Sequence, residues 1–190
     1  MKTKIIIAIM AFAMFACTQS KQADSKKDSQ PATEEIKDQG QANVAVTEGE
    51  DPNALQVAKS LDDFSTLVVA IETAGVQNSV VNAGPLTIFA PMNTAFAKLP
   101  EGTVEELLKP ESKPTLAYIL TNHVAPANYP MKQLKKEAKK GRKLYMASGQ
   151  YLVVEDKEDG IYVGGTKVLK SVKVSNGWIH VIDDVIVPEK

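Results

Sequence analysis

Few residues in this 190-residue sequence could carry out chemistry on a substrate. It contains one cysteine, Cys17, and two histidines, His123 and His180. A single cysteine cannot form an intramolecular disulfide, and two histidines cannot build a histidine-rich metal site. The sequence also lacks the Gly-x-Ser-x-Gly nucleophile motif, the His-Glu-x-x-His zinc motif and a glycine-rich phosphate loop with lysine. We therefore expect no catalytic residue, no metal and no cofactor.

Cys17 follows a segment that is typical of an export signal. Two lysines precede an apolar run at residues 5–16, which is shorter than the roughly 20 residues of a membrane-spanning helix. The run ends in Met14-Phe15-Ala16-Cys17, which resembles the processing site of bacterial lipoproteins. We predict a signal peptide at residues 1–16 and a lipid on Cys17, which anchors the protein in the cell envelope. The absence of an acidic residue directly after Cys17 favours the outer membrane, and secretion or a periplasmic location is the alternative.

Residues 17–52 have the composition of a flexible tether. From Thr18 to Glu50 there are seven acidic and four basic residues, and apolar residues are scarce. Such a segment buries too little apolar surface to offset the entropy cost of ordering it. We expect it to hold a single folded domain, residues 53–190, away from the membrane.

The domain changes from a helical to a strand-like pattern along its length. Leu61, Phe64, Val68 and Ile71 recur at helical spacing after a capping box at 60–63, and Gly75 is expected to end this helix. Further helices are expected after Asn93, after a second capping box at 103–106, and over 114–122. Strands are expected at 86–90, 144–147, 151–155, 161–163, 168–174, 178–182 and 185–187. This order predicts an α+β fold, with N-terminal helices covering a mostly antiparallel sheet.

Three stretches of the domain form a recognisable series. They are Phe64-Ser65-Thr66-Leu67, residues 87–96 (TIFAPMNTAF) and residues 176–188 (NGWIHVIDDVIVP). In this order and at these distances they resemble the fasciclin domain family. The resemblance implies a β-wedge or sandwich of mostly antiparallel strands flanked by helices, in secreted or surface-attached adhesion proteins that bind proteins or carbohydrates. The Tyr-His pair of the family reads Asn122-His123 here.

We interpret the residues of these motifs as structural. They are Thr87, Phe89, Pro91, Asn93, Phe96, Asn176, Gly177, His180 and Asp183. Thr87 and Phe89 are expected in a central strand that Pro91 ends, and Asn93 is expected to cap a short helix that buries Phe96. His180 shares a strand face with two large apolar residues, which is more typical of a hydrogen-bonded core histidine than of a catalyst.

Two segments are candidates for ligand contact. Residues 123–129 are expected to form an exposed loop in which a structural role of His123 is favoured; for ligand contact, His123 and Tyr129 are the candidate residues of this loop. The segment 131–143 has seven basic residues and one acidic residue. Its lysines could form a patch for an anionic partner, or be the solvated side of an amphipathic helix. These lysines are Lys135, Lys136, Lys139 and Lys140.

A formal net charge of −1 gives no strong basic excess, so we expect no nucleic-acid partner. The acidic residues at 155–159 are interpreted as a solvated hairpin turn before Gly160 rather than a calcium site. We expect a lipid-anchored adhesion module that contacts extracellular polysaccharide or a surface protein, as in a biofilm. The alternatives are an envelope hydrolase acting on glycans or peptides, whose carboxylate pair would leave no sequence motif, and a periplasmic structural or stress protein.

Overall fold

The computed structural model describes residues 51–82 and 84–188. The expected signal peptide, Cys17 and the tether up to residue 50 lie outside the described residues. The expected domain of residues 53–190 lies within them, apart from residue 83 and the last two residues.

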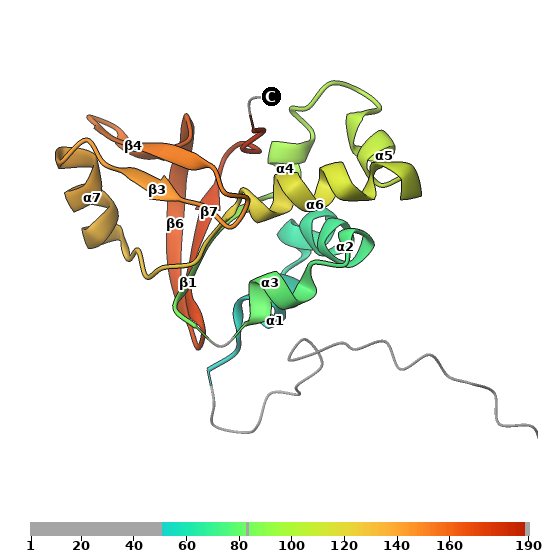
Figure 1. Ribbon diagram of the computed structural model, residues 1–190, viewed down its shortest axis with the longest axis horizontal. Helices are drawn as coiled ribbons and strands as arrows, with labels where there is room; N and C mark the ends of the chain where they lie inside the picture. The colour runs from blue at the N-terminus through green and yellow to red at the C-terminus, as the bar shows by residue number, and fades with distance from the viewer. Residues whose placement is uncertain (1–50, 83, 189–190) are drawn as a thin grey trace, which may run out of the picture. The chain divides into compact units, whose positions relative to one another are not determined.

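A seven-stranded sheet lies at the centre of the described domain, in the order β2-β1-β7-β6-β5-β4-β3 (Figure 1). The strands are β1 (Leu86–Pro91), β2 (Val124–Ala125), β3 (Lys143–Tyr145), β4 (Tyr151–Lys157), β5 (Gly160–Val163), β6 (Thr166–Val174) and β7 (Gly177–Ile182). Neighbouring strands are antiparallel, except that β1 and β7 are parallel, with Leu86 opposite Gly177. The predicted α+β fold with a mostly antiparallel sheet is confirmed.

All the α-helices of the described chain precede β3 in sequence. Helices α1 to α6 gather on one side of β1 and β7, whereas α7 lies near β3 and β4 (Figure 1). The α-helices are α1 (Ala54–Lys59), α2 (Ser65–Ala74), α3 (Gln77–Val81), α4 (Asn93–Phe96), α5 (Thr103–Leu107), α6 (Lys113–Thr121) and α7 (Met131–Lys139). Two 3₁₀ turns are η2 (Asp62–Phe64) and η3 (Pro110–Ser112). Within the described ranges, each helix is too short or too polar to cross a lipid bilayer.

Strand β1 contributes to two apolar clusters because successive side chains of a strand point to opposite faces. Ile88 packs in the cluster formed with helices α1, α2 and α6, where Leu67 and Ile71 are also buried. Phe89 packs in the second cluster, with Leu134 of α7 and buried side chains of β3, β4, β5 and β6. All six residues of β1 are therefore buried, which explains why its sequence is apolar apart from Thr87.

The first helix begins earlier than the sequence indicated. Asn53 forms the capping box of α1, because its side chain accepts from Gln56 N at 3.0 Å and its backbone N donates to Gln56 Oε1 at 2.7 Å. Ser60, the expected cap, instead ends α1 and donates its hydroxyl to Val57 O at 2.8 Å. Leu61 consequently lies outside α2 and is 47% exposed. The expected end of the helix at Gly75 is confirmed by its left-handed φ of 72°.

Two other local expectations are wrong. Gly102, not Thr103, is the N-cap residue of α5, and no side chain caps that helix. Residues 185–187 form no strand in the described chain. Instead, Ile186 is buried and its backbone N donates to a ring nitrogen of His123 at 2.9 Å. A side chain therefore satisfies this backbone donor in place of a neighbouring strand.

Candidate functional site

His180 lies in the middle of β7, fully buried, with both ring nitrogens engaged. Nε2 is 2.7 Å from the main-chain oxygen of Tyr129, and Nδ1 is 2.7 Å from Ser171 Oγ. A carbonyl oxygen can only accept, so Nε2 donates and Nδ1 accepts from the serine hydroxyl. The ring also stacks on Phe89 at 5.4 Å, and its burial lowers the pKa of His180. His180 therefore joins β6, β7 and the loop before α7, as a structural residue would.

Thr87 holds the same loop from β1. Its hydroxyl donates to Ala127 O at 2.7 Å and accepts from Tyr129 N at 2.9 Å. Two residues of the family motifs, Thr87 and His180, thus bind the main chain of Tyr129, and a third, Phe89, stacks on the His180 ring. They fix the path of the loop between β2 and α7.

His123 lies in the core, not in the exposed loop that the sequence indicated. Only 3% of it is exposed, its Nδ1 donates to Ile119 O at 2.8 Å and its Nε2 accepts from Ile186 N at 2.9 Å. Desolvation by burial lowers the pKa of His123 to about 4. Both ring nitrogens are therefore engaged within the protein, which corrects the expectation of an exposed His123 and favours its structural interpretation. Tyr129 is only partly buried, and burial raises the pKa of its hydroxyl.

Asn93 caps a helix, but not the one that the sequence indicated. It is the first residue of α4, and its side chain turns to the start of α2, where Oδ1 accepts from Thr66 N at 3.0 Å. Its Nδ2 donates to Asp62 O at 2.9 Å. The motif residue thereby satisfies one free backbone donor of a helix that lies about thirty positions earlier.

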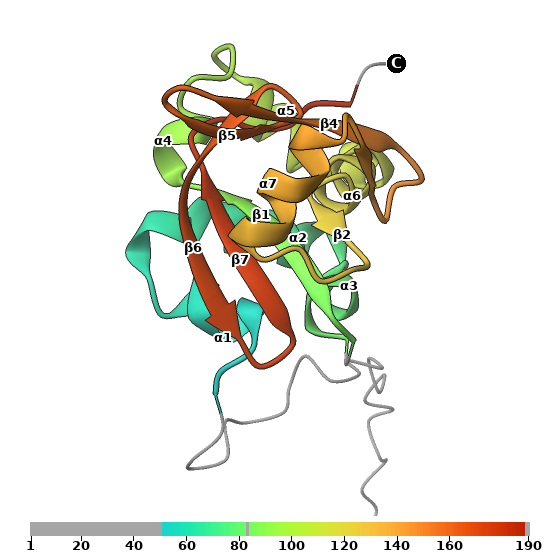
Figure 2. The same cartoon turned by 90° about the vertical axis from the view of Figure 1, so that its left-hand side faces the viewer.

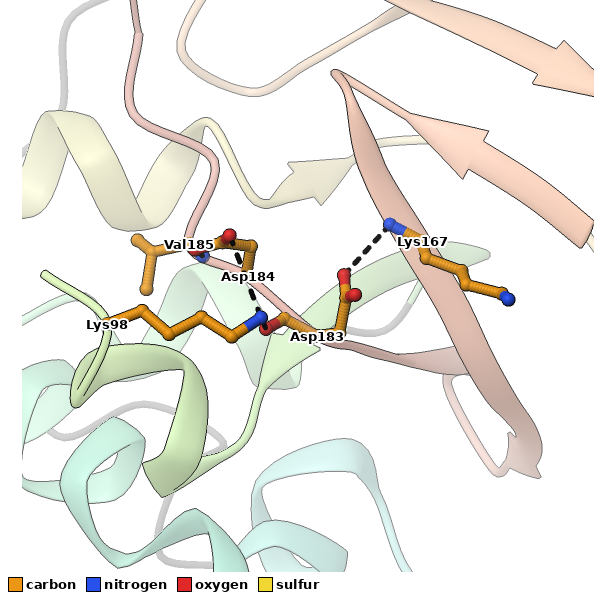
Figure 3. Close-up of polar contacts among 5 residues, drawn as sticks. All are labelled: Lys98, Lys167, Asp183, Asp184 and Val185. Atoms are coloured by element: carbon orange, nitrogen blue, oxygen red, sulfur yellow. Dashed lines mark hydrogen bonds and ion pairs between the residues drawn. The ribbon is translucent and has the colours of Figure 1, made fainter.

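Asn176 and Asp183 fix the two ends of β7. Asn176 Oδ1 accepts from Ala54 N at 3.1 Å, and its Nδ2 donates to Val80 O at 2.9 Å, so it ties α1 and α3 to the sheet. At the other end, Asp183 Oδ1 accepts from Lys167 N at 3.0 Å (Figure 3). Lys98 Nζ donates to the main-chain oxygen of Asp183 at 2.6 Å, as Figure 3 also shows.

The four lysines of the basic segment lie on the outer side of α7 and at its end, exposed and without an ion pair among the described residues. Leu134 and Glu137 form the buried side of the helix, and Glu137 lies 3.7 Å from Arg142. The positive charge of the four lysines is therefore available to solvent and to an anionic partner. Elsewhere in the described chain, no group of three or more His, Cys, Asp or Glu side chains is arranged to hold a metal ion.

Exposed aromatic side chains gather on one face of β3 and β4. Tyr145 is 48% exposed and Tyr151 is 62% exposed, and their ring centroids lie 5.3 Å apart with an interplanar angle of 56°. The antiparallel register places the two tyrosines opposite each other and places Lys143 opposite Val153 in the same two strands. We call these four residues the tyrosine face.

The tyrosine face was not singled out from the sequence, although strand alternation could have found it. Leu144 and Val154 are buried, so their neighbours in each strand must point outward. Exposed apolar groups that gather on one face mark contact surfaces, and tyrosine offers a rigid apolar ring with a hydrogen-bonding hydroxyl. This face can therefore contact a flat, hydroxyl-rich or partly anionic ligand.

The sequence of this chain is similar to those of known proteins. A family model described as the Fasciclin domain matches residues 62–188. Protein sll1483 of Synechocystis sp. is 41% identical over 135 residues, which cover 70% of this chain and 72% of that protein. Human periostin is 30% identical over 132 residues, which cover 67% of this chain but 15% of periostin.

Among solved structures that are similar in fold, one serves as an example. It is a FAS1 domain pair from the insect cell adhesion molecule Fasciclin I, with a TM-score of 0.65 and 21% sequence identity. The similarity covers 76% of this chain and 57% of the solved chain. At this identity the comparison shows a shared fold alone.

Proposed function

The chain belongs to the fasciclin domain family, and from that premise we propose that it is a non-enzymatic adhesion module of the bacterial cell envelope. The family includes proteins of cell adhesion, such as the insect molecule whose domain pair shares this fold. Both histidines are buried in hydrogen bonds that hold the fold together, which supports a binding role over a hydrolase built around a histidine.

Its partner in this proposal is an extracellular polysaccharide that contacts the tyrosine face. The observation that carries the proposal is the exposed pair Tyr145 and Tyr151, which are held opposite each other by the register of β3 and β4. Their rings offer apolar area at a low entropy cost, because a tyrosine side chain has few rotatable bonds. Lys143 on the same face favours a polysaccharide with carboxylate groups.

The test is binding to immobilised alginate, a polyuronate, with neutral dextran for comparison. Tyr151→Ala should weaken binding to alginate about tenfold, because an interface aromatic contributes on the order of 1–2 kcal/mol. Val69→Ala is the matched control, since Val69 is an exposed apolar residue on α2, away from this face. Equal affinity of Tyr151→Ala and the unchanged protein would contradict the proposal. A surface protein captured through the same two tyrosines would point to the alternative partner.

We further propose that a lipid on Cys17 holds the module on the envelope, where many copies can bind one polymer and raise the avidity. Cys17→Ala should move the protein from the membrane fraction into the soluble fraction or the medium. If Cys17→Ala stays in the membrane fraction, the proposed lipid anchor on Cys17 is wrong. Protease treatment of intact cells then separates a module on the outer surface, which is cut, from a periplasmic structural or stress protein, which is protected.

A further inference from the structure

An apolar groove opens on the part of the domain that contains α1, away from the strands of the tyrosine face. It has a volume of about 290 Å³ and lies between α1, the turn that follows it, α2 and the strands β1, β6 and β7. Figure 2 shows α1 beside the ends of β6 and β7. Leu55, Leu61, Phe64, Leu169, Val172 and Val181 are among its lining side chains. We call this site the apolar groove.

Two leucines of the apolar groove are exposed for identifiable reasons. Leu61 stands in the turn between α1 and η2, and is 47% exposed. Leu169 is the extra residue of a β-bulge in β6, because Val168 pairs with Ile182 and Lys170 with the adjacent Val181. A bulge redirects a side chain, and Leu169 is 48% exposed. The apolar groove is therefore exposed to water in the free protein. Binding of an apolar group that displaces this water is favourable in free energy.

The lining determines which apolar occupant fits. It consists mainly of aliphatic side chains, with the ring of Phe64. A peptide would have to bury its backbone N–H and C=O groups against these side chains, at a cost in free energy. An alkyl chain has no polar group to desolvate. The volume is at the lower end of the range for small-molecule sites, so it suits one alkyl chain better than two.

Two charged side chains among the lining residues indicate the head group. Lys170 comes from β6 and Asp63 from η2, and both line the apolar groove. In the described chain neither of them has a hydrogen bond or an ion pair from its side chain. A head group with one negative and one positive charge complements Lys170 and Asp63. A fatty-acid anion carries only a negative charge, so it would pair with Lys170 but be repelled by the carboxylate of Asp63.

We propose that the apolar groove binds the acyl chain of a single-chain zwitterionic phospholipid, with the phosphate at Lys170 and the ammonium group at Asp63. This site is separate from the tyrosine face and does not depend on polysaccharide binding. It would give the domain a contact with lipid molecules in addition to any covalent lipid at its N-terminus.

The test uses the exported protein with Cys17→Ala and alkylphosphocholines of eight, ten and twelve carbons, below their critical micelle concentrations. Calorimetry should show an affinity that rises about fourfold for each added methylene until the groove is filled. An affinity that does not change with chain length would overturn the proposal. Sodium decanoate should bind more weakly than decylphosphocholine, and tighter binding of decanoate would overturn the assignment of the head group.

Paired variants locate the site. Leu169→Asn should weaken dodecylphosphocholine binding at least tenfold. Val69→Asn is the matched control, because Val69 is also 48% exposed but does not line the groove, and it should leave binding unchanged. Lys170→Gln and Asp63→Asn should each weaken it about fivefold, with Lys173→Gln and Asp62→Asn as controls outside the lining. Circular dichroism should show the same fold for every variant, since all these positions are exposed. Equal losses in the variants and their controls would overturn the proposed site.

Discussion

Gly177 and Leu86 approach each other so closely that position 177 has no room for a side chain. A Cβ on Gly177 would lie 1.8 Å from the main-chain oxygen of Leu86. The two residues are the first pair of the parallel ladder between β1 and β7, and Gly177 has a φ of 143°. The central pairing of the sheet therefore depends on a glycine at this position.

We expect Gly177→Ala to lower the free energy of unfolding by about 2–5 kcal/mol. The positive φ costs an L-residue about 1–2 kcal/mol, and displacing packed backbone adds about 1–3 kcal/mol. Urea unfolding measures the loss. Gly102→Ala is the control, because Gly102 has a φ of 81° but an added Cβ there meets nothing within 4 Å. Equal losses in the two variants would show that the close approach to Leu86 is unimportant.

Asn93→Ala should lower the free energy of unfolding by about 1–2 kcal/mol, because Thr66 N at the start of α2 loses its acceptor. Asn93→Asp keeps an acceptor for Thr66 but loses the donor to Asp62 O, so its loss should be smaller. Thermal and urea unfolding measure both losses. The exposed Asn128→Ala serves as the control, and a comparable loss there would argue against the cap.

The sequence was informative where a local pattern decides the structure. The apolar run before Pro91 became β1, and the left-handed Gly75 ended α2 as expected. Five of the later expected strands overlap β3 to β7, because Gly and Asp turns separate them clearly. Helix starts were less predictable, since Asn53 and Ser60 both have cap-forming side chains and only packing decides between them.

The sequence could not reveal the burial of His123. Its partner Ile186 lies 63 positions away, so no local pattern records their contact. The same holds for the apolar groove, which depends on a bulge at Leu169 that follows from the register of β6 against β7. By contrast, Tyr145 and Tyr151 could have been recognised from alternation on either side of one turn.

Thr87→Val should release the loop between β2 and α7. The substitution removes the hydroxyl that donates to Ala127 O and accepts from Tyr129 N, and it keeps a similar shape. We expect a loss of about 1–3 kcal/mol in stability, because two polar groups lose their partner. Hydrogen exchange at the Tyr129 amide should become faster than in the unchanged protein. Thr87→Ser retains the hydroxyl, and exchange as fast in Thr87→Ser as in Thr87→Val would contradict this role.

The stability of the domain should fall as the pH is lowered from 7 to 5. The pKa of His123 is about 4 in the folded protein, compared with 6.5 for an unperturbed histidine. The unfolded chain therefore binds the proton first, so the stabilisation is complete above pH 6.5 and is lost progressively down to about pH 4. This difference predicts a loss of about 2 kcal/mol between pH 7 and pH 5. The lowered pKa of His180 acts in the same direction.

Urea unfolding at pH 7, 6 and 5 measures this dependence, above the range in which most carboxylates titrate. His123→Gln removes one titrating group, so its stability should change markedly less with pH, even if it is lower at pH 7. The variant loses the ring that accepts from Ile186 N, and the segment after β7 should then show faster amide exchange at neutral pH. A pH dependence that is as steep in His123→Gln as in the unchanged protein would assign the effect to other groups.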